Sequence, residues 1–365
     1  MKNKERMIGL DILRILSMLG IIGLHLIGQG GILGNLNLMN YRTFVILFIY
    51  AICYLSVDVF GILSGYLSWK KKKINYTRIV ELIIITFFHC FIITFIFYYF
   101  NLYDFKTLGL KEIINSIFPA LIGRNWYITS YIFVFFMMPY SNHLIEKLEQ
   151  KSMKNMLITL FIMLCIIPNI FWQTDFFKAS NGYSPLWLLY CYLLGGYLGK
   201  YGLSKKINKK RITIVTSCII LAYVSNILVR IITFKIYGQV LYESWFINYV
   251  SPFNVIASLL LVPIFSSIKI KNSVINRIIV FFSVSSFAVY IIHCHYLVYD
   301  YCILDIMKFC VERNAIIIVL YFTLFCFGIY LVCSVVDFLR IKLFKIFKID
   351  NLVNKIGEML NDLLK

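Results

Sequence analysis

The chain has 365 residues, of which 61% are hydrophobic and only 15% are charged. Ordinary soluble domains carry about 25% charged residues, and a domain of this size must still cover its core with a polar surface. These proportions exclude a disordered chain, a disulfide scaffold and an ordinary cytosolic enzyme. They indicate a protein solvated mostly by lipid, and we expect an all-α bundle of transmembrane helices.

Apolar runs of about 17–25 residues are typical of spanning helices. We expect ten of them, near 8–28, 44–68, 79–101, 125–141, 154–172, 184–200, 211–234, 251–268, 278–299 and 315–338. The sequence thus predicts a transmembrane domain over 1–338. In the remaining segment, 339–365, apolar residues recur at helical spacing between Lys and Asp, which predicts an amphipathic helix on the cytoplasmic surface.

The chain carries 36 Lys and Arg against 17 Asp and Glu, a net charge of +19. If ten spans alternate in direction, 26 of the basic residues fall on one side and nine on the other, with Arg14 inside the first span. Cytoplasmic loops carry such an excess, so both termini are expected in the cytoplasm. This asymmetry accounts for most of the charge without nucleic acid, and we interpret the run Lys70–Lys73 as an orientation and lipid-headgroup signal.

Ionisable side chains inside a membrane are costly unless they are paired or hydrated, so each is a functional candidate. Arg14 and His25 lie eleven residues apart in the first predicted span, close to three helical turns, so both project from one face. They are separated by roughly 16 Å along the helix axis. Asp11 precedes Arg14 by one turn and can pair with it; in the alternative interpretation this pair only anchors the helix.

The ninth predicted span brings a second histidine to a similar depth. His293 lies about fifteen residues into that span, and His25 lies about seventeen residues into the first, so the two imidazoles can line one cavity. His295 follows two residues later and is expected to face roughly the opposite way. We interpret His89, in a run of Phe and Ile, as a hydrogen-bonded core histidine.

Small and charged residues also mark the second and third predicted spans. Ser64 and Gly65, which follow Asp58, approach the cytoplasmic end of the second span. Small residues allow close helix packing there; the alternative is a thin wall beside a ligand, with Asp58 orienting a partner. Arg78 and Glu81 lie one turn apart, and Arg78 either faces a phosphate or extends to lipid headgroups.

Four stretches of the chain form a recognisable series. They are Gly9–Arg14 with His25, Val57–Tyr66, Trp126–Pro139 and Ser285–His293. Together they resemble the membrane acyltransferase 3 family, polytopic enzymes that O- or N-acylate sugars and other cell-envelope acceptors. The first is similar to the family's Arg-x10-His signature, and the last to its late motif that ends in histidine. Because their order and distances also fit, the resemblance covers nearly the whole chain.

Two positions depart from the family's pattern. Gly61 stands where a second aromatic residue commonly follows Phe60. The family's usual proline shortly after the arginine of the third span is absent after Arg78, which weakens the transfer of that arginine's role to this chain.

The resemblance implies transfer of an acyl group, most often acetyl, from cytoplasmic acyl-CoA to a hydroxyl of a cell-surface glycan or a related envelope acceptor. The residues expected to take part are His25 and Asp58 in catalysis, Arg14, Arg78, Ser64 and Gly65 in donor binding, His293 and Trp126 on the acceptor side, and Asp11 and Glu81 in support. His25 is expected to act as general base, with Asp58 or another carboxylate orienting it. A covalent acyl-histidine is the alternative, and Trp126 equally fits an aromatic membrane belt.

We expect a multi-pass protein of a bacterial cell membrane, with lipid, acyl-CoA and a glycan or other envelope acceptor as partners. No bound cofactor, no metal and no nucleic acid are expected. The alternatives are a transporter or flippase for lipid-linked sugars, and a polysaccharide polymerase. Short outer segments and the absence of a detectable half-repeat favour the acyltransferase.

Overall fold

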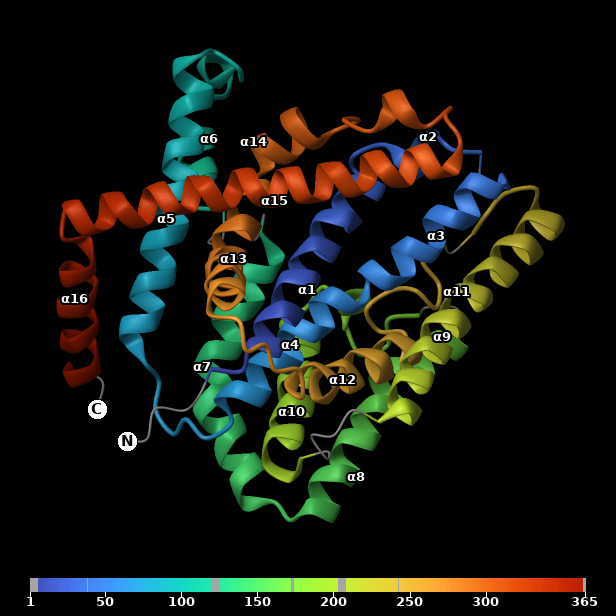
Figure 1. The fold of residues 1–365 in the computed structure, drawn as a ribbon, viewed down its shortest axis with the longest axis horizontal. Coiled ribbons are helices and arrows are strands. Elements are labelled where there is room, and N and C mark those ends of the chain that lie inside the picture. Colours follow the sequence, from blue (N-terminus) through green and yellow to red (C-terminus); the bar gives the residue numbers. More distant parts are fainter. Residues whose placement is uncertain are drawn as a thin grey trace.

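The computed structural model is helical throughout the part of the chain that it describes, which contains no strand (Figure 1). This part comprises residues 6–37, 39–119, 125–171, 174–202, 208–241 and 243–363, with only the backbone for 106–108. Six of the basic residues that enter the charge asymmetry lie outside it: Lys2, Lys4, Arg124, Lys205, Lys206 and Lys365. The all-α prediction is therefore confirmed for the described residues.

The longer helices follow the predicted spans in order, with two differences: the second predicted span is divided at Tyr54, and a helix over Phe105–Ile117 matches none of the predicted spans. They are α1 (Ile8–Ile27), α3 (Tyr41–Cys53), α4 (Leu55–Ser68), α5 (Tyr76–Tyr99), α6 (Phe105–Ile117), α7 (Trp126–Lys147), α8 (Gln150–Phe161), α10 (Pro185–Tyr201), α11 (Lys209–Tyr237), α12 (Pro252–Ser266), α13 (Ser273–His293), α15 (Ala315–Ile346) and α16 (Ile349–Leu363). Shorter turns are α2 (Ile32–Asn35), η1 (Ile162–Ile166), α9 (Ile167–Ile170), η2 (Ser180–Gly182), α14 (Tyr296–Val298), η3 (Tyr299–Ile303) and η4 (Lys308–Cys310).

Seven helical segments of the described chain are long and apolar enough to cross a membrane. They are Ile8–Asn35, Tyr41–Ser68, Tyr76–Tyr99, Gln150–Ile170, Lys209–Tyr237, Ser273–His293 and Ala315–Ile346. The other three predicted spans correspond to α7, α10 and α12. The 15 residues of α12 extend only about 22 Å, less than the roughly 30 Å hydrocarbon core of a bilayer. The count of ten spans stays a prediction.

Helices α4 and α10 approach each other through glycines. A Cβ atom on Gly65 would lie 1.9 Å from the carbonyl oxygen of Tyr192, and one on Gly195 would lie 1.9 Å from that of Ile62. No larger side chain fits at either position without separating the helices. Gly65 therefore serves close helix packing, as in the first of the two interpretations above.

Two contacts at different levels show that α1 and α13 lie side by side and run in the same direction. Near the start of α1, Nη1 of Arg14 donates to Oγ of Ser283 at 2.9 Å. Near its end, Nδ1 of His25 lies 3.1 Å from Nε2 of His293. The contacting residues are eleven apart on α1 and ten apart on α13, so one register is kept over about three turns.

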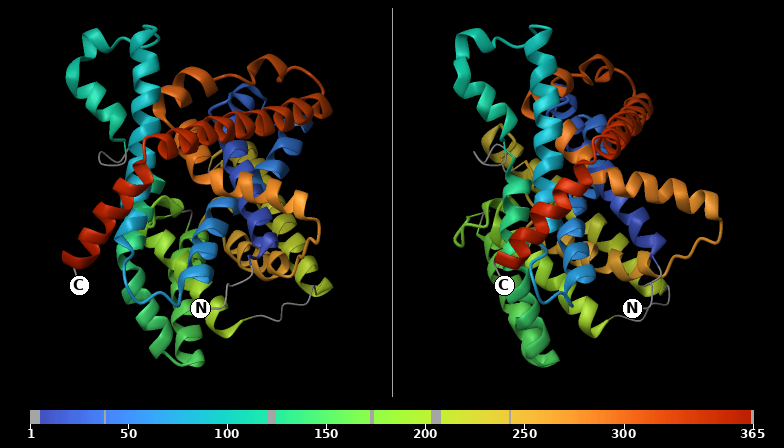
Figure 2. Two further views of the ribbon diagram at one scale, coloured as in Figure 1. Left: turned by 60° about the vertical axis from the view of Figure 1, so that its left-hand side comes forward. Right: turned by 90° about the vertical axis from the view of Figure 1, so that its left-hand side faces the viewer.

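The C-terminal helices differ from the predicted division of the chain. Helix α15 runs to Ile346, so the boundary predicted at residue 339 falls inside it, and the amphipathic helix is α16. This helix packs against α5, where the backbone N–H of Tyr76 donates to Oδ1 of Asn361 at 3.2 Å. The start of α1 and the end of α16 both lie on the side of the molecule away from α6 (Figure 2).

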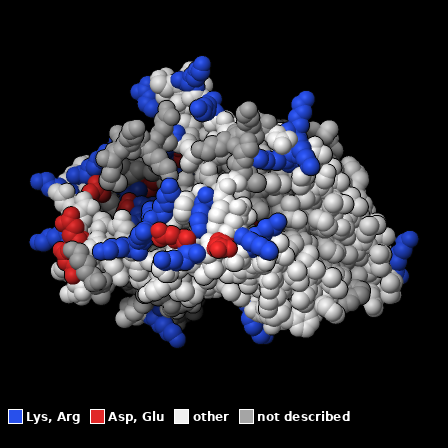
Figure 3. Space-filling model, turned by 90° about the horizontal axis from the view of Figure 1, so that it is seen from below, with Lys and Arg blue, Asp and Glu red and all other residues white. Residues whose placement is uncertain are grey.

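That side carries many more Lys and Arg than Asp and Glu (Figure 3). The excess of basic residues on this face agrees with the excess that the sequence predicts for one side of the membrane. The cytoplasmic position of this face, and with it the orientation of both termini, stays a prediction because it follows only from the charge rule.

Candidate active site

An ion pair forms near the start of α1, as its spacing predicted. Oδ1 of Asp11 accepts from Nη1 of Arg14 at 3.1 Å and from Oγ of Ser283 at 2.6 Å. Its Oδ2 accepts from Nε of Arg6 at 2.7 Å. Nη2 of Arg6 also donates to Oδ1, at 3.0 Å, so three side chains hold the carboxylate through four hydrogen bonds. The carboxylate positions Arg14, whose side chain keeps 27% of its surface exposed.

The Arg14 side chain faces a cavity of about 360 Å³ between α1, α4, α5, α7 and α13. Its lining residues are Arg14, Met18, Ile21, Phe60, Ser64, Arg78, Leu82, Tyr127, Tyr131, Ser283, Val284, Ser286, Phe287 and Tyr290. Three of the four residues expected to bind a donor, Arg14, Ser64 and Arg78, therefore line one cavity. The fourth, Gly65, lies at the α4–α10 contact instead and does not line the cavity.

Arg78 and Glu81 contact each other at the edge of this cavity. Nη1 of Arg78 donates to Oε2 of Glu81 at 2.5 Å, and both side chains are more than two-fifths exposed. Such a pair contributes little to stability. The guanidinium keeps further N–H groups for another partner, and the supporting role of Glu81 stays a prediction.

The two histidines that the sequence placed at matched depth contact each other close to this cavity. Nδ1 of His25 lies 3.1 Å from Nε2 of His293, and Nδ1 of His293 lies 2.6 Å from the carbonyl oxygen of Val289. Tyr290, which lines the cavity, has its ring centroid 6.1 Å from that of His293. The cavity thus reaches from the two arginines to within one helical turn of the imidazole pair.

The hydrogen bonds assign the tautomers of the pair when both rings are neutral. The carbonyl oxygen of Val289 only accepts, so Nδ1 of His293 carries the proton and its Nε2 accepts. Nδ1 of His25 must then donate to that Nε2, which leaves Nε2 of His25 with a lone pair. Within the described part of the chain, this atom has no hydrogen-bond partner, and the His25 side chain is only half-buried.

Cys294 and Tyr299 complete the surroundings of His25. Sγ of Cys294 lies 3.7 Å from Nδ1 of His25 and 3.4 Å from Nε2 of His293. The ring of Tyr299 meets that of His25 edge-on, with centroids 5.1 Å apart. The sequence analysis missed both residues, and Ser283 as well. The only sequence signal was that Ser283 precedes His293 by nearly the Arg14–His25 spacing.

Asp58 does not contact His25. It is fully buried, and its Oδ1 accepts from Nε1 of Trp187 at 2.9 Å, with Sγ of Cys191 at 3.9 Å. The expectation that Asp58 orients His25 is thus corrected: His293 occupies that position. The physical reason is that Asp58 faces α10, where an indole N–H binds one of its two carboxylate oxygens.

Trp126 also lies apart from the histidine pair. Its ring packs in a cluster with Tyr183 and Tyr249, at centroid distances of 4.9 and 6.2 Å. The neighbouring Tyr127 lines the cavity and lies 5.2 Å from the ring of Tyr290. Position 127 therefore contributes to the site, and the acceptor role of Trp126 stays a prediction.

The other two buried histidines agree with their sequence interpretation. Nε2 of His89 lies 3.3 Å from Oδ1 of Asp337, and both residues are nearly inaccessible. His295 points away from the pair, and its Nε2 lies 2.9 Å from the carbonyl oxygen of Ser116 on α6. Neither of these two histidines lines the cavity beside Arg14.

A second cavity, of about 700 Å³, opens beside the C-terminal end of α4. Its lining residues are Trp69, Lys70, Lys72, Pro139, Asn142, His143, Glu146 and Lys147. The Lys72 ammonium donates to Glu146 at 3.1 Å, and this hydrogen bond lowers the pKa of the Glu146 carboxyl. Its three lysines make the lining of this second cavity predominantly basic. Trp69, the first residue of the lining, follows Ser64 by five residues.

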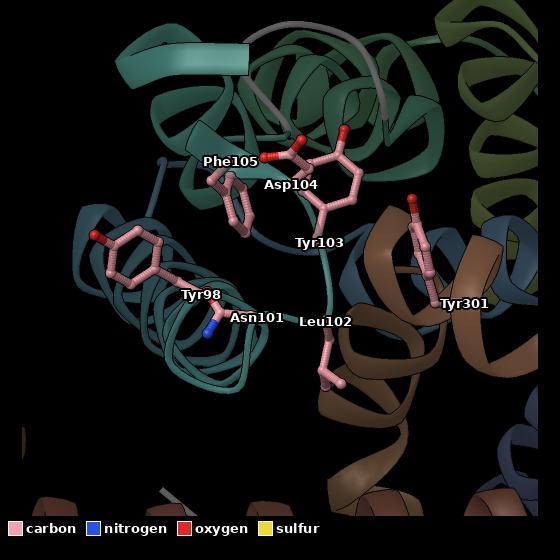
Figure 4. Close-up of a pocket in the computed structure, with 7 residues that line it drawn as sticks. All are labelled: Tyr98, Asn101, Leu102, Tyr103, Asp104, Phe105 and Tyr301. Atoms are coloured by element: carbon pink, nitrogen blue, oxygen red, sulfur yellow. The ribbon is translucent and has the colours of Figure 1, made fainter. Parts of the chain in front are cut away.

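A third cavity, of about 420 Å³, lies between α5, the start of α6 and η3. Aromatic rings surround it: those of Tyr103 and Tyr301 lie 5.5 Å apart, and Phe105 lies 4.7 Å from Tyr103 (Figure 4). None of the residues singled out in the sequence lines this cavity. Its residue Tyr301 belongs to η3, which begins at Tyr299, the residue whose ring meets that of His25.

Comparison with known families agrees with this site. A family model described as an acyltransferase domain, that of the acyltransferase 3 family, matches residues 7–337. No significant match was found among curated proteins or among solved structures. The matched region includes all the residues of the cavity and the histidine pair. The chain therefore belongs to the acyltransferase 3 family and is a membrane acyltransferase.

Proposed function

We propose that the protein transfers an acyl group, acetyl in the simplest case, from acyl-CoA to a hydroxyl of a cell-surface glycan or a related envelope acceptor. One observation carries the proposal: a single cavity has two arginines at one end and approaches an imidazole pair at the other. This arrangement suits a donor that is anionic at one end and reactive at the other. As expected from the sequence, we place the protein in a bacterial cell membrane.

The arginines suit the phosphates of the donor. Guanidinium groups bind phosphate oxygens through paired hydrogen bonds, and Arg14 is held in place by Asp11 while part of its surface remains open to the cavity. The lysines beside Trp69 extend the positive potential at the same end of α4. We therefore assign the polyanionic part of acyl-CoA to this end, with its thioester arm directed along the cavity.

The histidine pair suits the acyl-transfer step. Nε2 of His25, with a lone pair directed away from His293, takes the proton of the acceptor hydroxyl as its oxygen attacks the thioester carbonyl. The C–S bond then breaks, and the leaving CoA thiolate takes the proton from Nε2 of His25, which restores the neutral ring. His293 is a positioning residue: through its bond to Val289 it holds His25 in the tautomer that leaves Nε2 basic.

A covalent acyl-histidine remains the alternative path for the same residue. In that case Nε2 of His25 attacks the thioester carbonyl first and displaces the CoA thiolate. The acceptor hydroxyl then attacks the carbonyl carbon of the acyl-histidine, and the imidazole leaves. Both paths need the same tautomer and the same direction of approach. A rapid-quench experiment without acceptor separates them, because only the covalent path leaves labelled acyl groups on the protein.

The test is release of CoA thiol by the purified protein in detergent, supplied with labelled acetyl-CoA and isolated envelope glycan. We expect CoA release that depends on the acceptor, together with label in the glycan. A flippase or a polymerase of lipid-linked sugars releases no CoA. Absence of both signals with acetyl-, succinyl- and longer acyl-CoA donors would contradict the proposal.

A further inference from the structure

Three side-chain atoms that can bind a metal ion, two ring nitrogens and one sulfur, lie close together where the ends of α1 and α13 meet. Nδ1 of His25 and Nε2 of His293 are 3.1 Å apart, and Sγ of Cys294 lies 3.7 Å from the first and 3.4 Å from the second. Within the described part of the chain, these three side chains form a cluster whose ligand atoms all lie within 4.8 Å of one another. The acyl-transfer chemistry proposed above uses the two histidines and leaves the thiol without a role.

The three distances match one face of a tetrahedral zinc site. Zinc binds nitrogen at about 2.0–2.1 Å and sulfur at about 2.3 Å. In a tetrahedron these bond lengths place two nitrogens about 3.3–3.4 Å apart and a nitrogen and a sulfur about 3.5–3.6 Å apart. Each observed distance lies within about 0.3 Å of these values, so the three atoms already have the mutual spacing of ligands to one ion.

The surroundings also have the features of a metal site. A histidine ligand usually donates its second ring N–H to a carboxylate or a backbone carbonyl, which fixes its tautomer and orientation. Nδ1 of His293 makes this bond to Val289 at 2.6 Å, so its Nε2 presents a lone pair to the cluster. His293 is buried, while His25 and Cys294 are half-buried, which leaves one side of the cluster open for a fourth ligand.

We propose that His25, His293 and Cys294 form a site for a divalent transition-metal ion of the zinc type, and that the bound ion blocks acyl transfer. The blocking part rests on the function proposed above. On binding, the thiol of Cys294 loses its proton to solvent, and the proton on Nδ1 of His25 moves to Nε2. Water fills the fourth position. Nε2 of His25 is then protonated and no longer accepts the proton of the acceptor hydroxyl.

Binding is tested first, without reference to activity, by titrating the metal-free protein in detergent with Co²⁺. A thiolate bound to tetrahedral Co²⁺ gives a near-ultraviolet charge-transfer band that nitrogen and oxygen ligands do not give. We expect this band in the unmodified protein and in Cys302→Ser, which removes an exposed cysteine, and its loss in Cys294→Ser. Displacement of Co²⁺ by Zn²⁺ should abolish the band, since zinc suits the same ligands.

A second measurement needs no variant at Cys294. Zn²⁺ should slow alkylation of Cys294 in the unmodified protein, followed by peptide mass spectrometry, and leave alkylation of Cys302 unchanged. Absence of the cobalt band in the unmodified protein, or its persistence in a folded Cys294→Ser variant, overturns the proposed site. Equal alkylation of Cys294 with and without Zn²⁺ overturns it as well.

The blocking effect is measured as CoA release with and without Zn²⁺, each protein being compared with its own metal-free rate. We expect Zn²⁺ to slow the unmodified protein by about 10²-fold or more, the range associated with loss of a general base, and a chelator to restore the rate. A cobalt band that depends on Cys294 together with an unchanged rate refutes the blocking effect but not the site. If no donor gives CoA release even without metal, the proposed function fails, whereas the spectroscopic result still decides on the site.

Discussion

Two histidine clusters in this molecule differ in how completely their polar groups are hydrogen-bonded. His89 on α5 contacts Asp337 on α15, and Nε of Arg340 donates to the same carboxylate oxygen at 2.6 Å. All three residues are at least nine-tenths buried. His25, in contrast, pairs with another imidazole, is half-buried, and keeps one ring nitrogen without a partner in the described chain.

The difference teaches how a polar group inside a membrane protein is stabilised and how it is made reactive. Around His89, a carboxylate and a guanidinium compensate each other and the histidine adds a hydrogen bond, which favours one rigid packing of α5 on α15. Around His25, the hydrogen bonds of the partner ring leave a lone pair directed away from the pair. The first arrangement satisfies polar groups, and the second leaves a reactive atom accessible.

The largest effect expected from this comparison is on catalysis at His25. Replacing His25 with Ala should lower the rate of CoA release by about 10²–10⁴-fold, because the general base is lost. The melting temperature in detergent should stay close to that of the unmodified protein. The control is Asn351→Ala, which removes an exposed polar side chain on α16. Near-normal turnover in His25→Ala would show that the comparison assigns the wrong histidine to catalysis.

The next largest difference is expected between variants of Arg14, which lines the cavity, and of Arg340, which binds Asp337 beside His89. Arg14→Gln should raise the KM for acyl-CoA by about 10- to 100-fold, since hydrogen bonds to a charged group contribute about 1.5–3 kcal/mol. Asp11 keeps Arg6 and Ser283 as partners in this variant, so folding should be preserved. Arg340→Gln should leave that KM unchanged and lower the melting temperature. Steady-state kinetics at saturating acceptor measure the donor KM, and an unchanged value for Arg14→Gln contradicts its phosphate role.

The converse of the His25 variant is His89→Ala. Removing this ring leaves a cavity and takes one partner from the buried Asp337, which should cost about 1–3 kcal/mol of stability. The rate of CoA release per folded molecule should change less than about threefold, because the cluster is remote from the cavity. Thermal unfolding in detergent and the rate of CoA release at one temperature are compared with those of Asn351→Ala. A His89→Ala variant that melts normally but has lost its turnover would show that His89, and not only His25, is needed for catalysis.

The smallest effect is expected at Ser64, which lines the cavity but is already satisfied. Its Oγ donates to the carbonyl oxygen of Phe60 at 2.9 Å within α4, so no hydroxyl hydrogen remains for the donor. Ser64→Ala should therefore change the donor KM by less than about threefold, since a bond of this kind contributes little. Ser64→Leu serves as the contrasting variant: its larger side chain should fill part of the cavity and raise the KM. A large effect of Ser64→Ala would show that the serine contacts the donor directly.

The sequence was informative wherever the signal was local. The spacing of Arg14 and His25 predicted one helical face, and the interval between Asp11 and Arg14 predicted their ion pair, because helical geometry alone relates such residues. The matched depths of His25 and His293 rested on apolar segments of similar length. Their contact at 3.1 Å confirms that estimate.

The sequence was uninformative where a contact depends on how helices pack. Asp58 is followed by small residues and suggested a ligand wall, but it faces Trp187, which lies 129 residues further along the chain. Gly65 suggested donor binding and instead allows α4 to approach α10. Cys294 had no signal at all, because its importance arises only from its distance to two rings on separate helices.

The sequence by itself determined the class of this protein: a helical membrane protein whose first helix has a charged and an imidazole side chain on one face. Composition and helical periodicity suffice for that, since both act within single segments. Only the tertiary structure decided which groups share a cavity and which ring nitrogen is left basic. The physical reason is that α1 and α13 pack in parallel register, and this packing alone sets the hydrogen bonds that fix both tautomers.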